Sequence, residues 1–280
     1  MTSKKLKKFY EKLGAVYEEE KYVHSSGWGK SRRRFLKSIF RRYAKYVVKK
    51  SVLDIGCGGG IYLEIFKNAG AKAIFGADIS HPALLRAKQR CADAMLICAD
   101  AETLPIKSRF ADFILSSETI EHLENPEMFF SEIYRILKDG GKAIITCPNW
   151  RGEKPVEVDV GILKNFGIED DKYIHTAYKP DELEQLARNA GLHIIESGTF
   201  ERDMRIWGRI YDVIWNSLFS IMQRFAPAGL IRFAYKFYSL SGGILYEILR
   251  LSGIALLMRK IFRRGPRSFL IAEKTPGEQK

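Results

Sequence analysis

Short apolar runs alternate with amphipathic stretches along the middle of the chain. The runs that begin near Val52, Ala73, Ala94, Phe110 and Gly141 are rich in aliphatic and aromatic residues, which indicates buried strands. Between them, apolar residues three and four positions apart predict helices. Strands that alternate with helices in this order predict an α/β fold in which helices cover both faces of a mostly parallel sheet.

Two helical patterns precede this region. Residues 4–20 place apolar side chains at helical spacing, and a second amphipathic helix is expected to begin with Ser31 as its N-cap. The apolar face of the second helix is expected to pack on the sheet. Its basic face, which includes Arg32, is expected to be exposed to solvent. Whether this face also contacts an anionic surface is left open by the sequence.

A long helical segment separates the last two predicted strands. Residues 201–267 are apolar and rich in aromatics, but no uncharged run reaches the eighteen or so residues of a membrane span. Aromatics, short apolar runs and flanking Lys and Arg favour a helix pair lying in a membrane interface. The alternative is a helical lid that packs on itself or on a second subunit.

The net charge of +13 is unevenly distributed over the 280 residues. Residues 1–50 contain sixteen Lys and Arg against four Glu, and residues 201–267 contain twelve against four acids, so the remainder is net acidic. Two basic attachments on an acidic core indicate an anionic partner, either nucleic acid or anionic lipid. We divide the chain into a basic helical cap (1–50), a core (51–200), the insert (201–267) and a last strand with its tail (268–280).

The cysteines indicate neither a metal site nor a redox pair. Cys57, Cys91, Cys98 and Cys147 lack C-x-x-C spacing and fall mostly in or beside predicted strands, as reduced cytosolic thiols do. We predict no metal site. Residues 1–12 are polar and show no signal peptide, so a cytoplasmic location is expected.

The most informative motif is the glycine turn after the first strand. Asp54-x-Gly56-x-Gly58-x-Gly60 leads into a helix, so the backbone can approach a ligand closely with helix N–H groups directed at it. The dinucleotide fingerprint would require a third glycine where Ile61 stands, which argues against an NAD-dependent dehydrogenase.

Acidic residues also end the next two strands. Asp78 lies twenty residues after Gly58, about where a βαβ unit places a carboxylate against ribose hydroxyls. Asp100 ends the third strand. One such acid is usually a solvated strand end or a helix cap, but three in register with the glycine turn indicate a ligand site.

Together these residues resemble motif I and the following strands of the class I S-adenosylmethionine (SAM)-dependent methyltransferases, in particular the methyltransferase type 11 and ubiquinone-biosynthesis-like group. The runs "EIYRILKDGG" (132–141) and "HTAYKPDELEQLARNAGLHIIESGTF" (175–200) are also similar to segments of that family. The resemblance implies a doubly wound, seven-stranded, mostly parallel Rossmann-like sheet. To this the sequence adds the N-terminal helices and a helical insert before the last strand, which departs from the family pattern.

The resemblance also implies the cofactor, S-adenosyl-L-methionine, and the residues that hold it. It implies that the glycine turn binds the methionine moiety and that the ends of the second and third strands bind the ribose and the adenine. The end of the fourth strand would close the site. The implied residues are Asp54, Gly56, Cys57, Gly58, Asp78, Ile79, Asp100, Ala101 and Ser117.

The catalytic base is less well specified. His122 and His175 are the candidates, with Glu118 and Glu121 as weaker ones, and His122 could instead be a helix-start histidine held by a hydrogen bond. No Asn/Asp-Pro-Pro-Tyr/Phe motif follows the fourth strand, which argues against amino methylation of nucleobases or glutamine.

Three functions remain open at this point. The favoured one is methyl transfer to an oxygen or activated carbon of an amphiphilic small molecule, such as an isoprenoid quinol, a lipid or a lipid-linked sugar, by an enzyme peripheral on the inner face of a membrane. An RNA methyltransferase is disfavoured because no RNA-binding module is visible. A catalytically silent adaptor is disfavoured by the intact glycine turn and acids. The sequence leaves the oligomeric state open.

Overall fold

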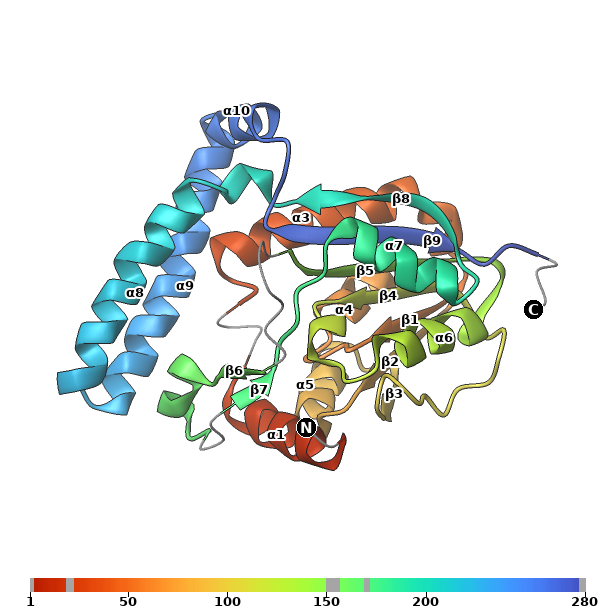
Figure 1. Cartoon of the computed structure of the whole chain (residues 1–280), viewed down its shortest axis with the longest axis horizontal. Coiled ribbons are helices and arrows are strands. Elements are labelled where there is room, and N and C mark those ends of the chain that lie inside the picture. Colours follow the sequence, from red (N-terminus) through yellow and green to blue (C-terminus); the bar gives the residue numbers. More distant parts are fainter. Residues whose placement is uncertain (1–2, 19–22, 150–156, 169–171, 277–280) are drawn as a thin grey trace.

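The chain folds around one seven-stranded sheet (Figure 1). The computed structural model describes residues 3–18, 23–149, 157–168 and 172–276. The strand order is β3-β2-β1-β4-β5-β9-β8, and β9 runs antiparallel to both of its neighbours. The predicted mostly parallel sheet with an antiparallel last strand is therefore confirmed. The strands are β1 (Ser51–Ile55), β2 (Ala73–Asp78), β3 (Met95–Cys98), β4 (Ala111–Ser117), β5 (Leu137–Pro148), β8 (His193–Phe200) and β9 (Arg267–Glu273).

Helices cover both faces of this sheet because alternate strand residues are apolar on both sides. On one face, Leu53 of β1 packs in a core cluster with Phe129 and Leu183. On the other face, Val52 packs with Leu36 and Phe66. The first face is covered by α6 (Pro126–Ile136) and α7 (Pro180–Asn189), and the second by α3 (Gly27–Arg42), α4 (Ile61–Asn68) and α5 (His81–Arg90).

Helix α3 begins earlier than predicted. Ser26 is its N-cap and accepts a hydrogen bond from the Gly29 backbone N–H, so the prediction that Ser31 caps the helix was wrong. Ser31 lies inside α3, where its hydroxyl donates to Asp203 at 2.6 Å. The start of α3 was predicted too late because Gly27 and Gly29 lie in its first turn, and glycine is a poor helix former that usually indicates the end of a helical pattern.

Arg32 does not belong to a solvated basic face, contrary to the expectation. Its side chain is buried and pairs with Glu118 at 3.4 Å and with Glu201 at 3.3 Å. Glu118 follows β4 and Glu201 follows β8, so α3 crosses the sheet where both strands end. A buried arginine requires such partners, since an unpaired buried charge is strongly destabilising.

The predicted helical insert lies between β8 and β9. It contains the short helix η4 (Arg202–Met204), then α8 (Trp207–Phe225), α9 (Ala228–Leu251) and α10 (Ile254–Ile261), and residues 201–266 supply no strand to the sheet. Helices α8 and α9 form a hairpin at one end of the molecule (Figure 1). Trp28 of α3 donates to Asp212 of α8 at 2.9 Å, and Arg259 of α10 pairs with the buried Asp203 at 2.6 Å.

In the part of the chain that the structure describes, no single helix has the length and apolar composition needed to cross a membrane. Helices α9 and α10 together meet that test of length and composition, with a bend of 82° between them.

The region before α7 is more ordered than its composition indicated. The residues between Trp150 and Lys172 are rich in Gly, Asp and Lys, a composition typical of an irregular segment. In the fold, however, β6 (Glu157–Asp159) pairs with β7 (Lys172–Ile174), and the short helix η3 (Gly161–Phe166) lies between them. The first predicted helix is present as α1 (Ser3–Val16). Two short helices complete the fold, η1 (Ala44–Tyr46) and η2 (Ile120–His122).

Candidate active site

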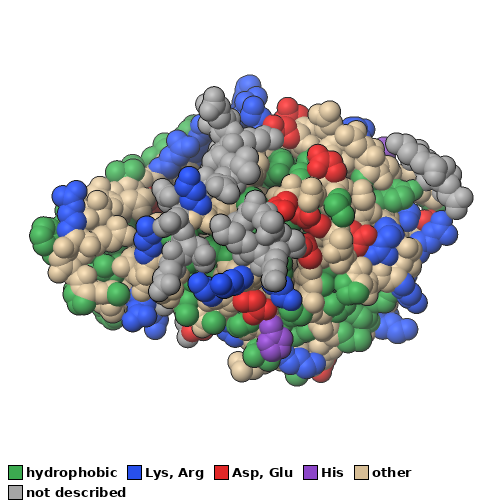
Figure 2. Space-filling view, turned by 60° about the horizontal axis from the view of Figure 1, so that its bottom comes forward, with side chains coloured by type: hydrophobic (Ala, Val, Ile, Leu, Met, Phe, Trp, Pro, Cys, Tyr) green, Lys and Arg blue, Asp and Glu red, His purple; other side chains and the backbone are tan. Residues whose placement is uncertain are grey.

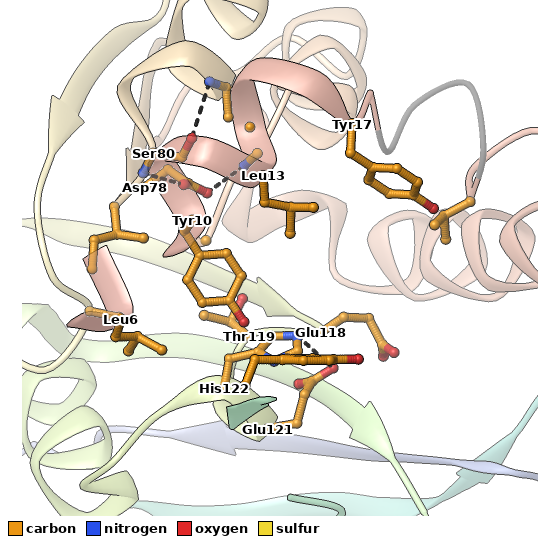
Figure 3. A pocket seen from close by; sticks show the side chains of 18 of the residues that line it. Leu6, Tyr10, Leu13, Tyr17, Asp78, Ser80, Glu118, Thr119, Glu121 and His122 are labelled. Atoms are coloured by element: carbon orange, nitrogen blue, oxygen red, sulfur yellow. Dashed lines mark hydrogen bonds and ion pairs between the residues drawn. The ribbon is translucent and has the colours of Figure 1, made fainter. Parts of the chain in front are cut away.

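A cavity of about 550 Å³ opens at the carboxyl ends of β1, β2 and β4, beneath α1 (Figure 3). Its size is typical of small-molecule sites. The strand order reverses between β1 and β4, and open α/β sheets bind their ligands at such a switch point. The wall also includes Tyr173 of β7, His175 directly after β7, and Tyr235 of the insert.

The glycine turn forms one wall of the cavity in a conformation that other residues would strain. Gly56 has φ +74°, and a Cβ atom on it would lie 2.1 Å from Thr119 Oγ1. Gly58 donates its backbone N–H to Asp78 Oδ2 at 2.8 Å, which joins the turn to the end of β2. The turn therefore presents backbone to the cavity at close range.

Asp78 is bonded directly to this turn. Its second oxygen accepts the Ser80 backbone N–H at 2.9 Å, and burial raises the pKa of its carboxyl group. A carboxylate has about four acceptor positions, so two backbone donors leave capacity for the two hydroxyls of a ribose. Ile79, Asp100 and Ala101 line the cavity beside it, as the resemblance implied for the adenine end.

Asp54 lies behind the turn rather than in the cavity wall. It is 1% exposed, and among the described residues its carboxyl oxygens have no hydrogen-bond partner. Burial, and then the nearby Asp78 charge, raise the pKa of this carboxyl group well above its usual range. A buried polar group of this kind needs a partner, and the cationic amino group of SAM at the turn is of the right chemistry. The residues present therefore fit this cofactor.

Two other predicted cofactor residues lie elsewhere. Cys57 and Ser117 line a small neighbouring cavity rather than the main one. The Ser117 hydroxyl is 2.9 Å from Thr146 Oγ1 of β5, so it bonds across the sheet.

His122 and His175 come together at the opposite end of the cavity. Their ring centroids are 5.2 Å apart, and both residues line the cavity. The Ile174 carbonyl oxygen accepts the Nδ1–H of His122 at 3.0 Å, and Thr176 donates its backbone N–H to the Glu121 carbonyl at 2.7 Å. These two bonds tie the chain after β7 to η2.

Burial sets the protonation of both rings. It lowers the pKa of His122 to about 4, with the neighbouring His175 adding to the effect, and it also lowers the pKa of His175. Both imidazoles are therefore neutral at neutral pH, and a neutral ring nitrogen can accept a proton or bind a cation.

The two glutamates that follow β4 differ in their partners. Glu118, at φ +61°, forms ion pairs with Arg32 and Arg267, which neutralise it and weaken its candidacy as a base. Glu121 is 1% exposed, and its Oε1 lies 3.9 Å from His122 Nε2. Glu121 thus faces the histidines while Glu118 faces the arginines.

The aromatic residues around the histidines were not predicted as site residues. Tyr10 points from α1 toward His122, with 5.5 Å between ring centroids, and Tyr173 lies 6.1 Å away (Figure 3). Phe9 stacks on Tyr173 at 5.3 Å. The helical pattern of residues 4–20 predicted that α1 carries aromatic residues. It could not predict that they line the cavity, because this depends on where the helix packs in the fold.

Comparison with known proteins gives the class. A model of a methyltransferase domain matches residues 53–145. Over 150 residues the chain is 30% identical to the malonyl-acyl-carrier-protein O-methyltransferase of Marinomonas sp. (strain MWYL1), covering 52% of this chain and 54% of that protein. It is 29% identical over 155 residues to the mitochondrial ubiquinone biosynthesis O-methyltransferase of Rattus norvegicus, covering 51% and 44%. The chain thus matches about half of these relatives' length.

Solved structures share the fold at low identity. The cyclase SpnF has a TM-score of 0.63 at 18% identity, covering 99% of this chain and 98% of that one. Phosphoethanolamine N-methyltransferase 2 of Haemonchus contortus, solved with S-adenosyl-L-methionine, has a TM-score of 0.58 at 20% identity, covering 95% and 60%. Residues 53–145 thus form a methyltransferase domain, and the chain has the fold of the class I SAM-dependent methyltransferases. Within that class it is a distant relative of the ubiquinone-biosynthesis O-methyltransferases.

Proposed function

We propose that the protein transfers a methyl group from SAM to an oxygen atom of an amphiphilic small molecule. One observation carries this proposal: a single cavity joins Asp78 and the glycine turn to the pair His122 and His175. The O-methyltransferases among its relatives support oxygen as the acceptor atom.

The residues divide between the two ends of the cavity. Asp78 binds the ribose hydroxyls, Asp54 and the turn hold the methionine part, and Asp100 with Ala101 meets the adenine. When bound, SAM supplies a methyl group on a positively charged sulfur, which departs as a neutral thioether. At the other end, the acceptor hydroxyl lies against the histidines, and its proton passes to a neutral imidazole.

The acceptor end suits a molecule with an apolar part. Val160, Leu163 and Tyr173 line it beside the histidines, and Tyr235 reaches it from α9. These side chains offer packing area with few hydrogen-bond partners, as apolar ligands require. The insert therefore contributes to the cavity, and we propose that it helps to select the acceptor.

We further propose that the insert holds the enzyme on an anionic membrane surface. Phe225 is 85% exposed, Leu251 74% and Phe233 67%, which is unusual for side chains of this size. Further exposed apolar side chains lie along α8 and α9. They are Ile210, Ile214, Leu218, Ile221, Phe237, Leu240, Ile244 and Ile248.

Basic side chains accompany these apolar residues. Hydrophobic, Lys and Arg side chains share the end of the molecule that the hairpin forms (Figure 2). An apolar helix face with flanking positive charges favours the interface of anionic lipids, where amphiphilic acceptors are also found. Besides Arg259, which pairs with Asp203, the exposed basic residues of the insert are Arg209, Arg224, Arg232, Lys236, Lys260, Arg263 and Arg264.

Methyl transfer from labelled SAM tests the proposal. The protein is incubated with a membrane extract or with total RNA, and the labelled products are separated by chromatography. We expect label in an organic-soluble product of the membrane extract, and none when the protein is Asp78→Ala. Label found only in RNA would contradict the acceptor class, and no label in either would contradict the activity.

A further inference from the structure

We propose that Tyr235, which the helical insert contributes to the cavity, limits how much of an acceptor's apolar tail the cavity can enclose. This inference rests on the proposed function and specifies how the cavity distinguishes one amphiphilic molecule from another. Tyr235 belongs to α9, yet it lines the same cavity as His122 and His175. With the reacting hydroxyl at the histidines, the tail of the acceptor must extend along one of the remaining sides of the cavity.

The charges that line the cavity leave one side for such a tail. Among the described residues, all those that line the cavity from α1, η3, β7 and α9 are uncharged. The acidic and basic lining residues come instead from the strand ends and from α3, α5 and η2. Because apolar groups gain free energy by leaving water for an apolar wall, the tail would follow the uncharged side.

Helix α1 supplies much of this side through its residue spacing. Tyr10, Leu13 and Tyr17 are three and four positions apart, so they project from one helical face toward the cavity (Figure 3). The Tyr17 backbone N–H donates to the Leu13 carbonyl at 2.8 Å, which continues the helical turn to this residue. Leu163 of η3 packs with Leu13 in the same small hydrophobic cluster. An apolar path therefore leads from Tyr10, beside His122, to Tyr17.

Tyr235 lies at the far end of this path and is held firmly in place. Its ring centroid is 6.3 Å from that of Phe166 in η3, which is 5.2 Å from the ring of Tyr17. Within the insert, Tyr235 stacks on Tyr238 at 5.5 Å and packs against the buried Phe219 of α8 at 5.6 Å. Close-packed rings leave little space for Tyr235 to turn aside, so it forms a fixed end wall.

The environment beside Tyr235 is poorly hydrated, as a tail requires. Burial raises the pKa of the Tyr173 hydroxyl, and the nearby Glu121 and Tyr235 add to this effect. Tyr173 itself lies 6.1 Å from His122 between ring centroids, so Tyr235 acts within the acceptor end. Each methylene group buried along this path favours binding, whereas methylene groups beyond the end wall stay in water and add nothing.

The alternative is that Tyr235 only packs the hairpin onto η3, while the tail leaves the cavity elsewhere. In that case the volume of the side chain at position 235 would not affect which tails bind. The two interpretations therefore differ in how affinity depends on tail length when this side chain is made smaller or larger.

Binding of para-alkylphenols distinguishes the two interpretations. Each of these probes has one hydroxyl group and an unbranched tail, and the series runs from the methyl to the octyl compound. The full-length protein, saturated with S-adenosylhomocysteine, is titrated with each probe by calorimetry. In the wild type, affinity should rise by up to about fourfold per added methylene group until the tail reaches Tyr235, and then level off.

Two substitutions move the end wall in opposite directions. Tyr235→Ala should raise the affinity for the longest tails by more than about tenfold, because further methylene groups then become buried. Tyr235→Trp should make the affinity level off at a shorter tail and leave binding of the methyl compound unchanged. Phe233→Ala is the matched control, because this aromatic residue of α9 is 67% exposed and lies outside the cavity lining. It should bind every probe as the wild type does.

Calorimetric titration with SAM shows that each variant is folded, since the cofactor binds at the other end of the cavity. The same dependence on tail length in the wild type, Tyr235→Ala and Tyr235→Trp would overturn the end wall, as would a wild type that binds none of the phenols. If that result came with methyl transfer to a membrane-extract product, the proposed function would stand without the end wall. A changed dependence in Tyr235→Ala, in a protein without methyl transfer, would uphold the end wall and refute the proposed function.

Discussion

At the scale of single residues, Asp78 has the most clearly defined position in the cavity. It accepts hydrogen bonds from Gly58 and Ser80 and still presents acceptor capacity to the cavity. Its position was predictable because the spacing from the glycine turn follows from the βαβ unit. Arg32 was not predictable in the same way, since its partners Glu118 and Glu201 are distant in sequence and meet it only where α3 crosses the sheet.

Replacing Asp78 should weaken SAM binding, because it removes a carboxylate that faces the cavity and also holds the glycine turn through the Gly58 N–H. In Asp78→Ala two ribose hydroxyls lose their acceptors, which should cost about 2–4 kcal/mol of binding free energy by calorimetry. Asp78→Asn keeps one acceptor oxygen and should lose less. Asp93→Ala removes an exposed aspartate that pairs with Lys67, and it should bind SAM normally. Unchanged affinity in a folded Asp78→Ala protein would refute the assignment.

The buried His24 should make stability depend on pH. Burial, together with nearby arginines, lowers its pKa from 6.5 to about 3 in the folded protein. Between these values the unfolded chain binds the proton and the folded chain does not, so stability is lost as the pH falls below 6.5. From pH 6.5 to 5 the loss should be about 2 kcal/mol of unfolding free energy.

Chemical denaturation of His24→Gln at both pH values provides the check. The variant should show a smaller decrease between pH 6.5 and 5 than the wild type. An equal decrease in both proteins would mean that His24 titrates normally in the folded state.

At the scale of elements, α1 forms the roof of the cofactor end. The Gly14 carbonyl accepts a hydrogen bond from Arg86 of α5 at 2.5 Å, and Leu13 and Gly14 line the cavity. The sequence predicted this helix from its periodicity. The β6–β7 pair was missed because three-residue strands among Gly, Asp and Lys leave too short a pattern to detect.

A side chain at Gly14 should displace this roof. A Cβ there would lie 2.0 Å from Ser80 Oγ, so Gly14→Val must move α1 away from α5. Overpacking of this kind typically costs about 1–3 kcal/mol, and we expect a loss of SAM affinity of that order by calorimetry. Gly229→Ala is the control, since no atom lies within 4 Å of the added Cβ. If the two variants bind SAM equally well, α1 does not cover the cofactor.

At the scale of the whole molecule, charge and apolar surface concentrate in the insert. The sequence predicted its position, helical character and basic charge, because composition and strand spacing carry that information. It could not show which charges are free. Arg259 is basic in the sequence, but in the fold it pairs with the buried Asp203 and helps anchor the insert.

Vesicle co-sedimentation measures the proposed membrane contact. Each Lys or Arg near an anionic surface contributes about 1 kcal/mol, so changing Lys260, Arg263 and Arg264 to Glu should lower binding by more than about 100-fold. Phe225→Glu with Phe233→Glu should also reduce binding, whereas Leu85→Glu on α5 alters an exposed leucine outside the insert. Arg259 is kept, because its loss would leave the buried Asp203 without this ion-pair partner.

Salt provides a second test of this contact. The Debye length falls from about 10 Å at 0.1 M to about 3 Å at 1 M, so wild-type binding should weaken as salt rises. Wild-type protein that stays in the supernatant with anionic vesicles at low salt would identify the insert as a lid or a subunit contact.

The position of a bound cofactor product tests the central claim most directly. A crystal structure with S-adenosylhomocysteine should place the ribose hydroxyls on Asp78, the adenine beside Asp100 and Ala101, and the sulfur toward His122 and His175. Such a structure would join the two ends of the cavity in one reaction. A ligand in the reverse orientation, or bound outside this cavity, would contradict the account.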